Sequence, residues 1–244
     1  MWCKMSNFEL GTRVPLIFRA PWLESSVGAK TRALAEAVDL FPTLAELAGI
    51  DITTGEDGGE GEGEGEGEGE GDGGGSADGP YARLGGASLV PVFKDPAHAT
   101  AHDVALSQFP RCWQNNTFHM KNPFDGPGDE RNHTSVFEAM SDCHWTYRGH
   151  IDFMGYSMRT PTWRYTEWVE WDGTNLRPRW DALVGAELYD HAHDDGTEGT
   201  MDAVEFENLA APAVTRRNAT LAKIVAELSE RLHTEVEKWI SPTP

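Results

Sequence analysis

The chain has 244 residues, with 20 Lys and Arg against 40 Asp and Glu and a formal net charge of −20. This balance excludes nucleic acid as a partner, because binding a polyanion requires clustered positive charge. No stretch approaches the roughly 20 apolar residues that cross a bilayer, so we expect no membrane association. Half of the negative charge is local, since residues 55–79 contain ten acids, no base and 13 of the 26 glycines.

The first ordered elements are predicted before this acidic tract. A short apolar run between prolines at residues 13–21 predicts a buried strand or a sheet edge. From residue 31 to Gly49, apolar side chains recur at spacings of three and four, which predicts a helix that ends at Gly49. Pro42 lies inside this pattern, so we expect two helical pieces, the second beginning near Asp39.

Residues 51–80 form a low-complexity segment in which Glu-Gly is repeated. Glycine maximises the backbone entropy lost on folding and neighbouring carboxylates repel one another, so this segment is predicted to be a disordered insertion. It reads either as a spacer, which is the simpler interpretation, or as a diffuse binder of Ca²⁺ through loosely placed carboxylates. The second interpretation gives a weaker hypothesis, an acidic cation-binding protein.

After the insertion, a short helix or turn is expected at residues 86–93 and a strand at 103–109. Residues 110–150 are rich in Pro and Gly and read as one long irregular segment, a length that usually carries a function or a disulfide. Two alternating segments, 154–160 and 163–171, then predict an antiparallel hairpin.

The C-terminal part continues with a third short strand at residues 186–190 and a long helix. Pro212 suits the first turn of this helix and Pro242 ends it. We expect the helix to pack across the sheet through one apolar face, formed by Val214, Leu221, Ile224, Val225, Leu228, Leu232, Val236 and Trp239.

Two features favour an oxidising compartment. Cys112 and Cys143 stand at the ends of the long irregular segment, so we predict a disulfide between them and a free thiol at Cys3. Three Asn-x-Ser/Thr glycosylation acceptors also occur, at Asn115, Asn132 and Asn218. Cytosolic free thiols and chance triplets are the alternative reading of both features.

The familiar catalytic and phosphate-binding motifs are absent: there is no Gly-x-Ser-x-Gly, Gly-x-x-x-x-Gly-Lys, His-Glu-x-x-His or Cys-x-x-Cys. Residues 190–195 offer carboxylate and imidazole donors that could hold a divalent metal, although a solvated turn is the favoured interpretation. His98 and His102 are four residues apart but lack a third ligand nearby, so we expect them to be ordinary loop side chains.

Arg159 and Arg164 stand beside aromatic residues in the predicted hairpin. Guanidinium groups match sulfate or carboxylate, and aromatic faces stack on sugars, so this pattern could receive an anionic or sugar ligand. A cross-strand ladder of arginines and aromatics with a structural role is the favoured alternative.

Taken in order, the ordered segments resemble one family, the iduronate-2-sulfatase-like sulfatases of the alkaline-phosphatase-like superfamily. The first segment, Trp-Cys-Lys-Met-Ser-Asn-Phe-Glu at residues 2–9 followed by Val-Pro-Leu at 14–16, resembles the family pattern Trp-x-Lys-x-(Ser/Thr)-Asn-Phe-(Glu/Asp). Further matching stretches lie at residues 38–44, 86–91, 107–111, 154–160, 164–168 and 187–190.

The resemblance implies an α/β fold, of which this chain is the C-terminal part: a small antiparallel sheet packed by a long C-terminal helix. On this basis we expect residues 1–50 to end the large α/β domain, 51–80 to be the disordered insertion and 81–244 to form the C-terminal subdomain. The family hydrolyses sulfate esters, here of a sulfated glycan that contains uronic acid, and acts in lysosomes or outside the cell. No signal peptide is apparent at residues 1–6.

The resemblance also implies a mechanism. In the family, a cysteine in Cys-x-Pro-x-Arg becomes the formylglycine nucleophile and acidic residues hold Ca²⁺, but none of Cys3, Cys112 and Cys143 has this context. The calcium ligands are likewise expected outside this chain. Lys4 matches the family lysine that contacts the sulfate, whereas Met5 replaces the usual His or Tyr; a solvated terminal lysine is the alternative for Lys4.

Two functional hypotheses follow. The first is a sulfuric ester hydrolase represented by its C-terminal half and inactive alone. The second is a non-catalytic remnant that binds a glycan or assembles with the missing catalytic half.

Overall fold

The computed structural model describes residues 6–52, 86–112, 143, 148–194 and 205–240. Two compact units make up the chain: residues 1–18 with 104–244 form the first, and residues 19–103 form the second. The insertion predicted at 51–80 lies outside the described residues except for Asp51 and Ile52. No helix in the described ranges is long and apolar enough to cross a membrane.

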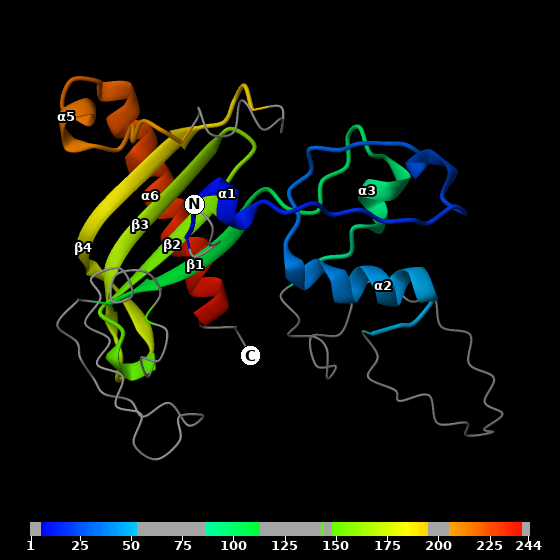
Figure 1. The fold of residues 1–244 in the computed structure, drawn as a ribbon, viewed down its shortest axis with the longest axis horizontal. Helices are drawn as coiled ribbons and strands as arrows, with labels where there is room; N and C mark the ends of the chain where they lie inside the picture. Colours follow the sequence, from blue (N-terminus) through cyan, green and yellow to red (C-terminus); the bar gives the residue numbers. More distant parts are fainter. Residues whose placement is uncertain (1–5, 53–85, 113–142, 144–147, 195–204, 241–244) are drawn as a thin grey trace, which may run out of the picture. The chain divides into compact units, whose positions relative to one another are not determined.

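The first unit is built on a four-stranded antiparallel sheet in the order β1-β2-β3-β4 (Figure 1). Its strands are β1 (Ala105–Arg111), β2 (Phe153–Arg159), β3 (Trp163–Asp172) and β4 (Arg177–Asp190). Each strand pairs with the next, and Arg159 lies opposite Arg164 at the tight β2–β3 connection. The predicted hairpin and the strand predicted at residues 103–109 are therefore confirmed. The short strand predicted at residues 186–190 is the end of the longer strand β4.

The long helix α6 (Ala219–Ile240) covers one face of this sheet, while the short helix α1 (Glu9–Thr12) lies on the other (Figure 1). Strand residues alternate between the two faces, so each strand supplies apolar side chains to the α6 side. Leu228, Leu232 and Val236 of α6 are buried there. They share the core with Met154, Tyr156, Met158, Tyr165, Val169, Leu188 and Ala210.

The predicted C-terminal helix is interrupted. Pro212 opens a separate short helix, α5 (Pro212–Thr215), and α6 begins only after Asn218. The side-chain oxygen of Asn218 accepts hydrogen bonds from the backbone N–H groups of Thr220 and Leu221, both 3.1 Å long, which caps α6. Trp239, which the sequence predicts on the buried face, is 41% exposed, so this part of the prediction is wrong.

The second unit contains α2 (Leu40–Ala48) and α3 (Val90–Lys94), with 3-10 turns η1 (Glu24–Ser26) and η2 (Ala37–Asp39); a further turn, η3 (Arg148–His150), precedes β2 in the first unit. As predicted, α2 ends at Gly49, whose φ of 71° is the left-handed conformation that glycine adopts without strain. The other helical piece is shorter than expected and consists of η2 alone.

The strand predicted at residues 13–21 does not form among the described residues. This stretch is extended but pairs with no described strand, and Ile17 is 89% exposed. An apolar run becomes a strand only where another strand accepts its backbone hydrogen bonds. The prediction is wrong because a sequence pattern reports the tendency of a segment to be extended but does not show whether a neighbouring strand is there to pair with it.

The sulfur atoms of Cys112 and Cys143 are joined in a disulfide in the structure, which links the end of β1 to the region before β2. Residues 113–142, between the two cysteines, lie outside the described ranges. They include the predicted acceptors Asn115 and Asn132.

Candidate functional site

The residues that follow Lys4 lie on the sheet face opposite α6. Lys4 and Met5 themselves lie outside the described residues, whereas Ser6, Asn7 and Glu9 are buried. The Asn7 side-chain amide donates to the carbonyl oxygen of Gly155 at 2.9 Å. This contact joins the segment to β2, 148 residues away in sequence.

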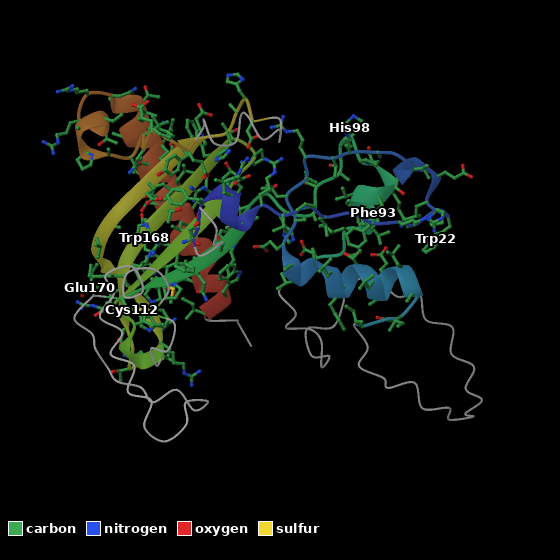
Figure 2. All side chains as sticks on the ribbon, viewed as in Figure 1. Trp22, Phe93, His98, Cys112, Trp168 and Glu170 are labelled. Carbon is green, nitrogen blue, oxygen red and sulfur yellow. A yellow bond between two sulfur atoms is a disulfide. The ribbon has the colours of Figure 1, made fainter. Side chains whose placement is uncertain are left out.

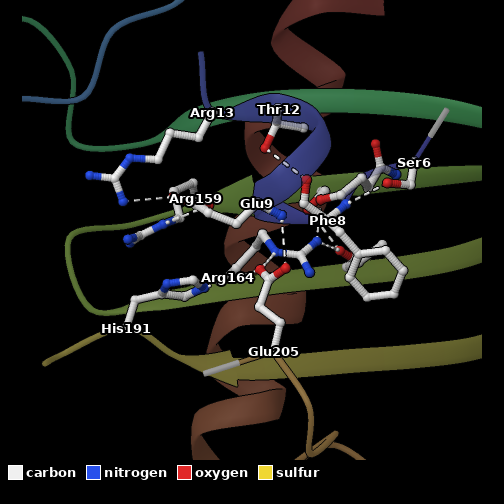
Figure 3. Close-up of polar contacts among 12 residues, drawn as sticks. Ser6, Phe8, Glu9, Thr12, Arg13, Arg159, Arg164, His191 and Glu205 are labelled. Atoms are coloured by element: carbon white, nitrogen blue, oxygen red, sulfur yellow. Dashed lines mark hydrogen bonds and ion pairs between the residues drawn. The ribbon is translucent and has the colours of Figure 1, made fainter. Parts of the chain in front are cut away.

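Arg164 is the centre of a buried ionic network beneath this segment (Figure 3). Its side chain is 2% exposed, its Nε donates to Glu205, and its Nη1 donates to the carbonyl oxygen of Asn7. The guanidinium carbon lies 5.1 Å from the ring centre of Phe8 and 5.0 Å from that of Tyr189. Arg164 is thus held by charge, hydrogen bonds and cation–π contacts together.

Glu205 connects the network to the backbone of α1. Its second carboxylate oxygen accepts a 2.8 Å hydrogen bond from the backbone N–H of Glu9, at the first turn of that helix. Burial alone would raise the pKa of Glu205, but hydrogen bonds from His191 and the charge of Arg164 outweigh it and hold the pKa below its ordinary value. Glu205 is therefore a carboxylate at neutral pH.

The other acids of the network each face a cation. Glu9 accepts from Arg159 Nε at 3.3 Å, and Arg13 Nη1 lies 3.0 Å from Asp194 Oδ2. Burial lowers the pKa of Arg159, and Glu9 opposes that shift, so Arg159 stays charged. Three carboxylates thus face three guanidinium groups.

His191 completes the network from the end of β4. Its Nδ1 is 3.1 Å from Asp194 Oδ2 and its Nε2 is 3.2 Å from Glu205 Oε1, and the ring is fully buried. Both His191 and Asp194 belong to the stretch at 190–195 for which a solvated turn was favoured. That interpretation holds for the turn residues Ala192 and His193, which are exposed, but is wrong for His191 and Asp194, which Glu205 and Arg13 cover.

Glu9, His191 and Glu205 are the described residues whose arrangement could hold a metal, with one ligand atom from each within 4.8 Å of the others. Their charges are already matched by Arg159 and Arg164, which would lie against any bound cation. Ca²⁺ also requires six to eight oxygen ligands and an imidazole is not one of them. The described residues therefore do not fit the calcium ion of the sulfatase family.

The arginines of the predicted hairpin and its tyrosines lie on opposite sheet faces. Arg159 and Arg164 point towards α1, while Tyr156 and Tyr165 are in the core under α6. Their guanidinium groups bind acids of this chain, so the structural interpretation is the one realised. Both arginines also donate to backbone carbonyl oxygens, Arg159 to Thr160 and Arg164 to Asn7, whereas Arg164 Nη2 is buried without a hydrogen-bond partner.

His98 and His102, both predicted to be ordinary loop side chains, differ in their contacts. His98 is exposed and contacts Asp95. His102 lies 2.7 Å from the fully buried carboxylate of Asp39 in the second unit and so has a defined structural role. Sequence inspection missed Asn7, Glu9, Arg13, Asp39 and Glu205, because each acquires its role from a residue at least 41 positions away.

Comparison with known proteins gives a consistent result. No family model matches the chain. It is 27% identical to mouse (Mus musculus) iduronate 2-sulfatase over 214 residues, which are 77% of this chain and 32% of that protein, and 26% identical to the human (Homo sapiens) protein over 219 residues with the same coverage. The chain spans about a third of the length of these curated relatives.

A solved structure called "a putative sulfatase from Bacteroides thetaiotaomicron VPI-5482" is 18% identical, covers 83% of this chain and 25% of that chain, and has a TM-score of 0.37. The sequence matches carry the assignment. They show that the chain is a sulfatase-like polypeptide related to a C-terminal part of the iduronate 2-sulfatases.

Proposed function

We propose that this chain is the C-terminal portion of a sulfuric ester hydrolase that acts on a sulfated, uronic-acid-containing glycan. The observation that carries the proposal is the attachment of residues 6–12, directly after Lys4, to the sheet through Arg164 and Glu205. A buried network of this kind fixes the backbone from which a substrate-contacting lysine would extend.

The proposed role of Lys4 is electrostatic. An ammonium group beside the sulfate would offset the charge that develops on the sulfuryl oxygens as the ester bond breaks. The nucleophile must come from elsewhere, because no cysteine of this chain stands in a Cys-x-Pro-x-Arg motif. Calcium would supply polarisation of the sulfate when bound, from ligands that the described residues do not provide. The chain alone is therefore proposed to be inactive.

A turnover assay tests this function directly. The full chain should not hydrolyse an aryl sulfate or a sulfated disaccharide above background, with Ca²⁺ present. Turnover by the chain alone that disappears in Lys4→Ala would contradict the proposed inactivity. Adding a polypeptide with the Cys-x-Pro-x-Arg motif should restore hydrolysis, and a Lys4→Ala chain should then give a lower rate than the unaltered chain.

The second candidate is a non-catalytic remnant that binds a glycan or a partner. It is favoured by the extended stretch before Phe18, where Val14 is 54% and Leu16 46% exposed. A monomeric chain that is retained by neither sulfated glycan resin nor a catalytic polypeptide would eliminate this candidate.

The proposed compartment is lysosomal or extracellular, as the relationship to iduronate 2-sulfatase and the cysteine and Asn-x-Ser/Thr patterns suggest. Thiol counting tests it on protein obtained from a secretory pathway. We expect one reactive thiol, from Cys3, in the denatured and unreduced protein. Three reactive thiols would show that Cys112 and Cys143 are reduced, and would argue against an oxidising compartment.

A further inference from the structure

The sheet face opposite α6 carries a row of aromatic side chains beyond the ionic network. Strand register places Phe109 of β1, Gly155 of β2, Trp168 of β3 and Gly185 of β4 opposite one another across the sheet. Trp168 follows Arg164 by four residues in β3, so both side chains lie on the same face. Trp168 is half-buried, and Figure 2 shows it on the sheet of the first unit. The row therefore lies next to the network and is in part open to solvent.

The two glycines of this row shape the space around Trp168. A Cβ atom on Gly155 would lie 2.6 Å from the nearest atom of the Trp168 ring, so the indole packs directly on the backbone of β2. A Cβ atom on Gly185 would meet no atom within 4 Å, so there is open space on the β4 side. The indole Nε1 donates to Glu187 at 3.3 Å, which orients the ring. An ordered indole thus borders open space on this face.

Charged groups lie on both sides of the indole. The guanidinium carbon of Arg111 is 5.1 Å from the ring centre of Phe109 and 5.5 Å from that of Trp168. A guanidinium stacked by its face on aromatic rings donates through its N–H edge, whose geometry matches carboxylate and sulfate. On the other side is Glu187, and burial raises its pKa despite the opposing hydrogen bond from Trp168 and the charge of Arg164. At the same acid pH, Glu187 is therefore neutral in a larger share of molecules than an ordinary glutamate, and it repels an anion less.

The composition and position of this row suit an anionic sugar. Binding sites for small molecules combine aromatic side chains with a few charged or hydrogen-bonding groups that fix the orientation of the ligand. Packing explains the contacts among these side chains, but it does not explain the open space at Gly185 beside them. Asn7, three residues after Lys4, donates to the carbonyl oxygen of Gly155 at 2.9 Å. A glycan that contacts Lys4 thus has the row within reach.

We propose that this row is a binding subsite for a sugar unit of an anionic, uronic-acid-containing oligosaccharide, next to the unit whose sulfate contacts Lys4. This deepens the proposed function and rests on it, since the sulfated glycan comes from there. We call it the Trp168 subsite, and it consists of Phe109, Arg111, Trp168, Gly185 and Glu187. One sugar ring occupies the space at Gly185 against the indole, Arg111 pairs with a carboxylate or sulfate group of the oligosaccharide, and Glu187 hydrogen-bonds a hydroxyl group.

Isothermal titration calorimetry of the full chain with a heparin tetrasaccharide tests the subsite and needs no catalytic part. Trp168→Ala removes the indole. Trp171→Ala is the matched control, because Trp171 is a half-buried tryptophan of the same strand that packs against the core under α6. We expect saturable binding that Trp168→Ala weakens about tenfold and that Trp171→Ala leaves unchanged.

Two further variants keep the test independent of any folding defect in Trp168→Ala. Gly185→Leu places a side chain in the open space, where a Cβ atom meets no neighbour, so the unfolding midpoint should stay the same while binding weakens about tenfold. Arg111→Gln removes the cation and should reduce the preference for the heparin tetrasaccharide over neutral maltotetraose. Arg231→Gln, at a half-buried position of α6, is its control and should keep that preference.

Any of three results would overturn the proposal: no saturable binding by the unaltered chain, equal losses in Trp168→Ala and Trp171→Ala, or equal affinity for the tetrasaccharide and maltotetraose. Undiminished binding by both Gly185→Leu and Arg111→Gln would overturn it as well. Binding that requires Trp168, without hydrolysis when the catalytic polypeptide is added, would refute the proposed function and leave the subsite standing. Hydrolysis together with undiminished binding by these variants would refute the subsite alone.

Discussion

The two faces of the sheet in the first unit are covered by different chemistry. Under α6 the contacts are mainly apolar, with Leu232 and Val236 against strand residues, and a hydrogen bond joins Glu167 to His233. Under residues 6–12 they are ionic, with Arg164 and Glu205 at the centre. Apolar packing tolerates small adjustments of position, whereas paired buried charges require defined geometry. The ionic face is the one that orients the segment after Lys4, so geometric precision lies where the proposed substrate contact begins.

The largest effect is expected on the ionic face, from Arg164→Met. This change leaves the buried Glu205 carboxylate without its cation, a loss that typically costs about 3–5 kcal/mol of unfolding free energy. Urea unfolding followed by tryptophan fluorescence measures it. The control is Arg177→Met, whose ion pair with Glu237 is half-exposed and which should cost at most about 1 kcal/mol. Equal losses in the two variants would show that the network contributes nothing beyond a surface pair.

A somewhat smaller effect is expected on the apolar face, from Leu232→Ala. This side chain is fully buried between α6 and the sheet, and a cavity there should lower the unfolding free energy by about 3 kcal/mol. Leu183→Ala, at a half-exposed position of β4, is the control and should change it by less than about 0.5 kcal/mol. If the m-value of Leu232→Ala also falls, α6 has detached instead of leaving a cavity.

The dependence of stability on acid pH should depend on a buried carboxylate on the α6 side of the sheet. Glu167, which contacts His233 of α6 at 2.7 Å, has a lowered pKa: burial would raise it, but hydrogen bonds from His233, Ser229 and Tyr165 outweigh that. Its folded pKa lies below the unfolded value of about 4.3. The stability it contributes is therefore present above that value and is lost as the pH falls through the folded pKa.

Unfolding free energy measured from pH 7 to pH 3 tests this sign. The unaltered chain should lose stability below about pH 4.3, and Glu167→Gln should show a smaller loss over the same interval. The pKa of Glu205, on the ionic face, is also lowered. The Glu167→Gln variant should therefore still lose some unfolding free energy as the pH falls. An unchanged acid slope in Glu167→Gln would contradict the assignment.

The smallest effect is expected at the start of α6. Asn218→Ala removes the cap and should cost about 1 kcal/mol, while Thr220→Ala keeps the capping side chain. Both changes remove the Asn-x-Thr acceptor, so in cells that glycosylate proteins both should lose the same mass if Asn218 carries a glycan. Thermal unfolding separates them: only Asn218→Ala should melt earlier through loss of the cap.

Sequence by itself determined the elements whose information is local. Alternating residues at 154–160 and 163–171 specify the hairpin, the apolar stripe through Leu228, Leu232 and Val236 specifies α6, and Gly49 specifies the end of α2. The sequence did not separate the two sheet faces, because it grouped Arg159 and Arg164 with tyrosines that the structure places on the opposite face. The order of the family-like motifs likewise depended on sequence alone.

Only the tertiary structure decided the partners. His191 and Asp194 are buried because Arg13 and Glu205 cover them, and Asp39 is buried because Ala87 and His102 donate to it. None of these pairings can be recognised from local sequence, since the spacing of charged residues does not show which distant residue each one contacts.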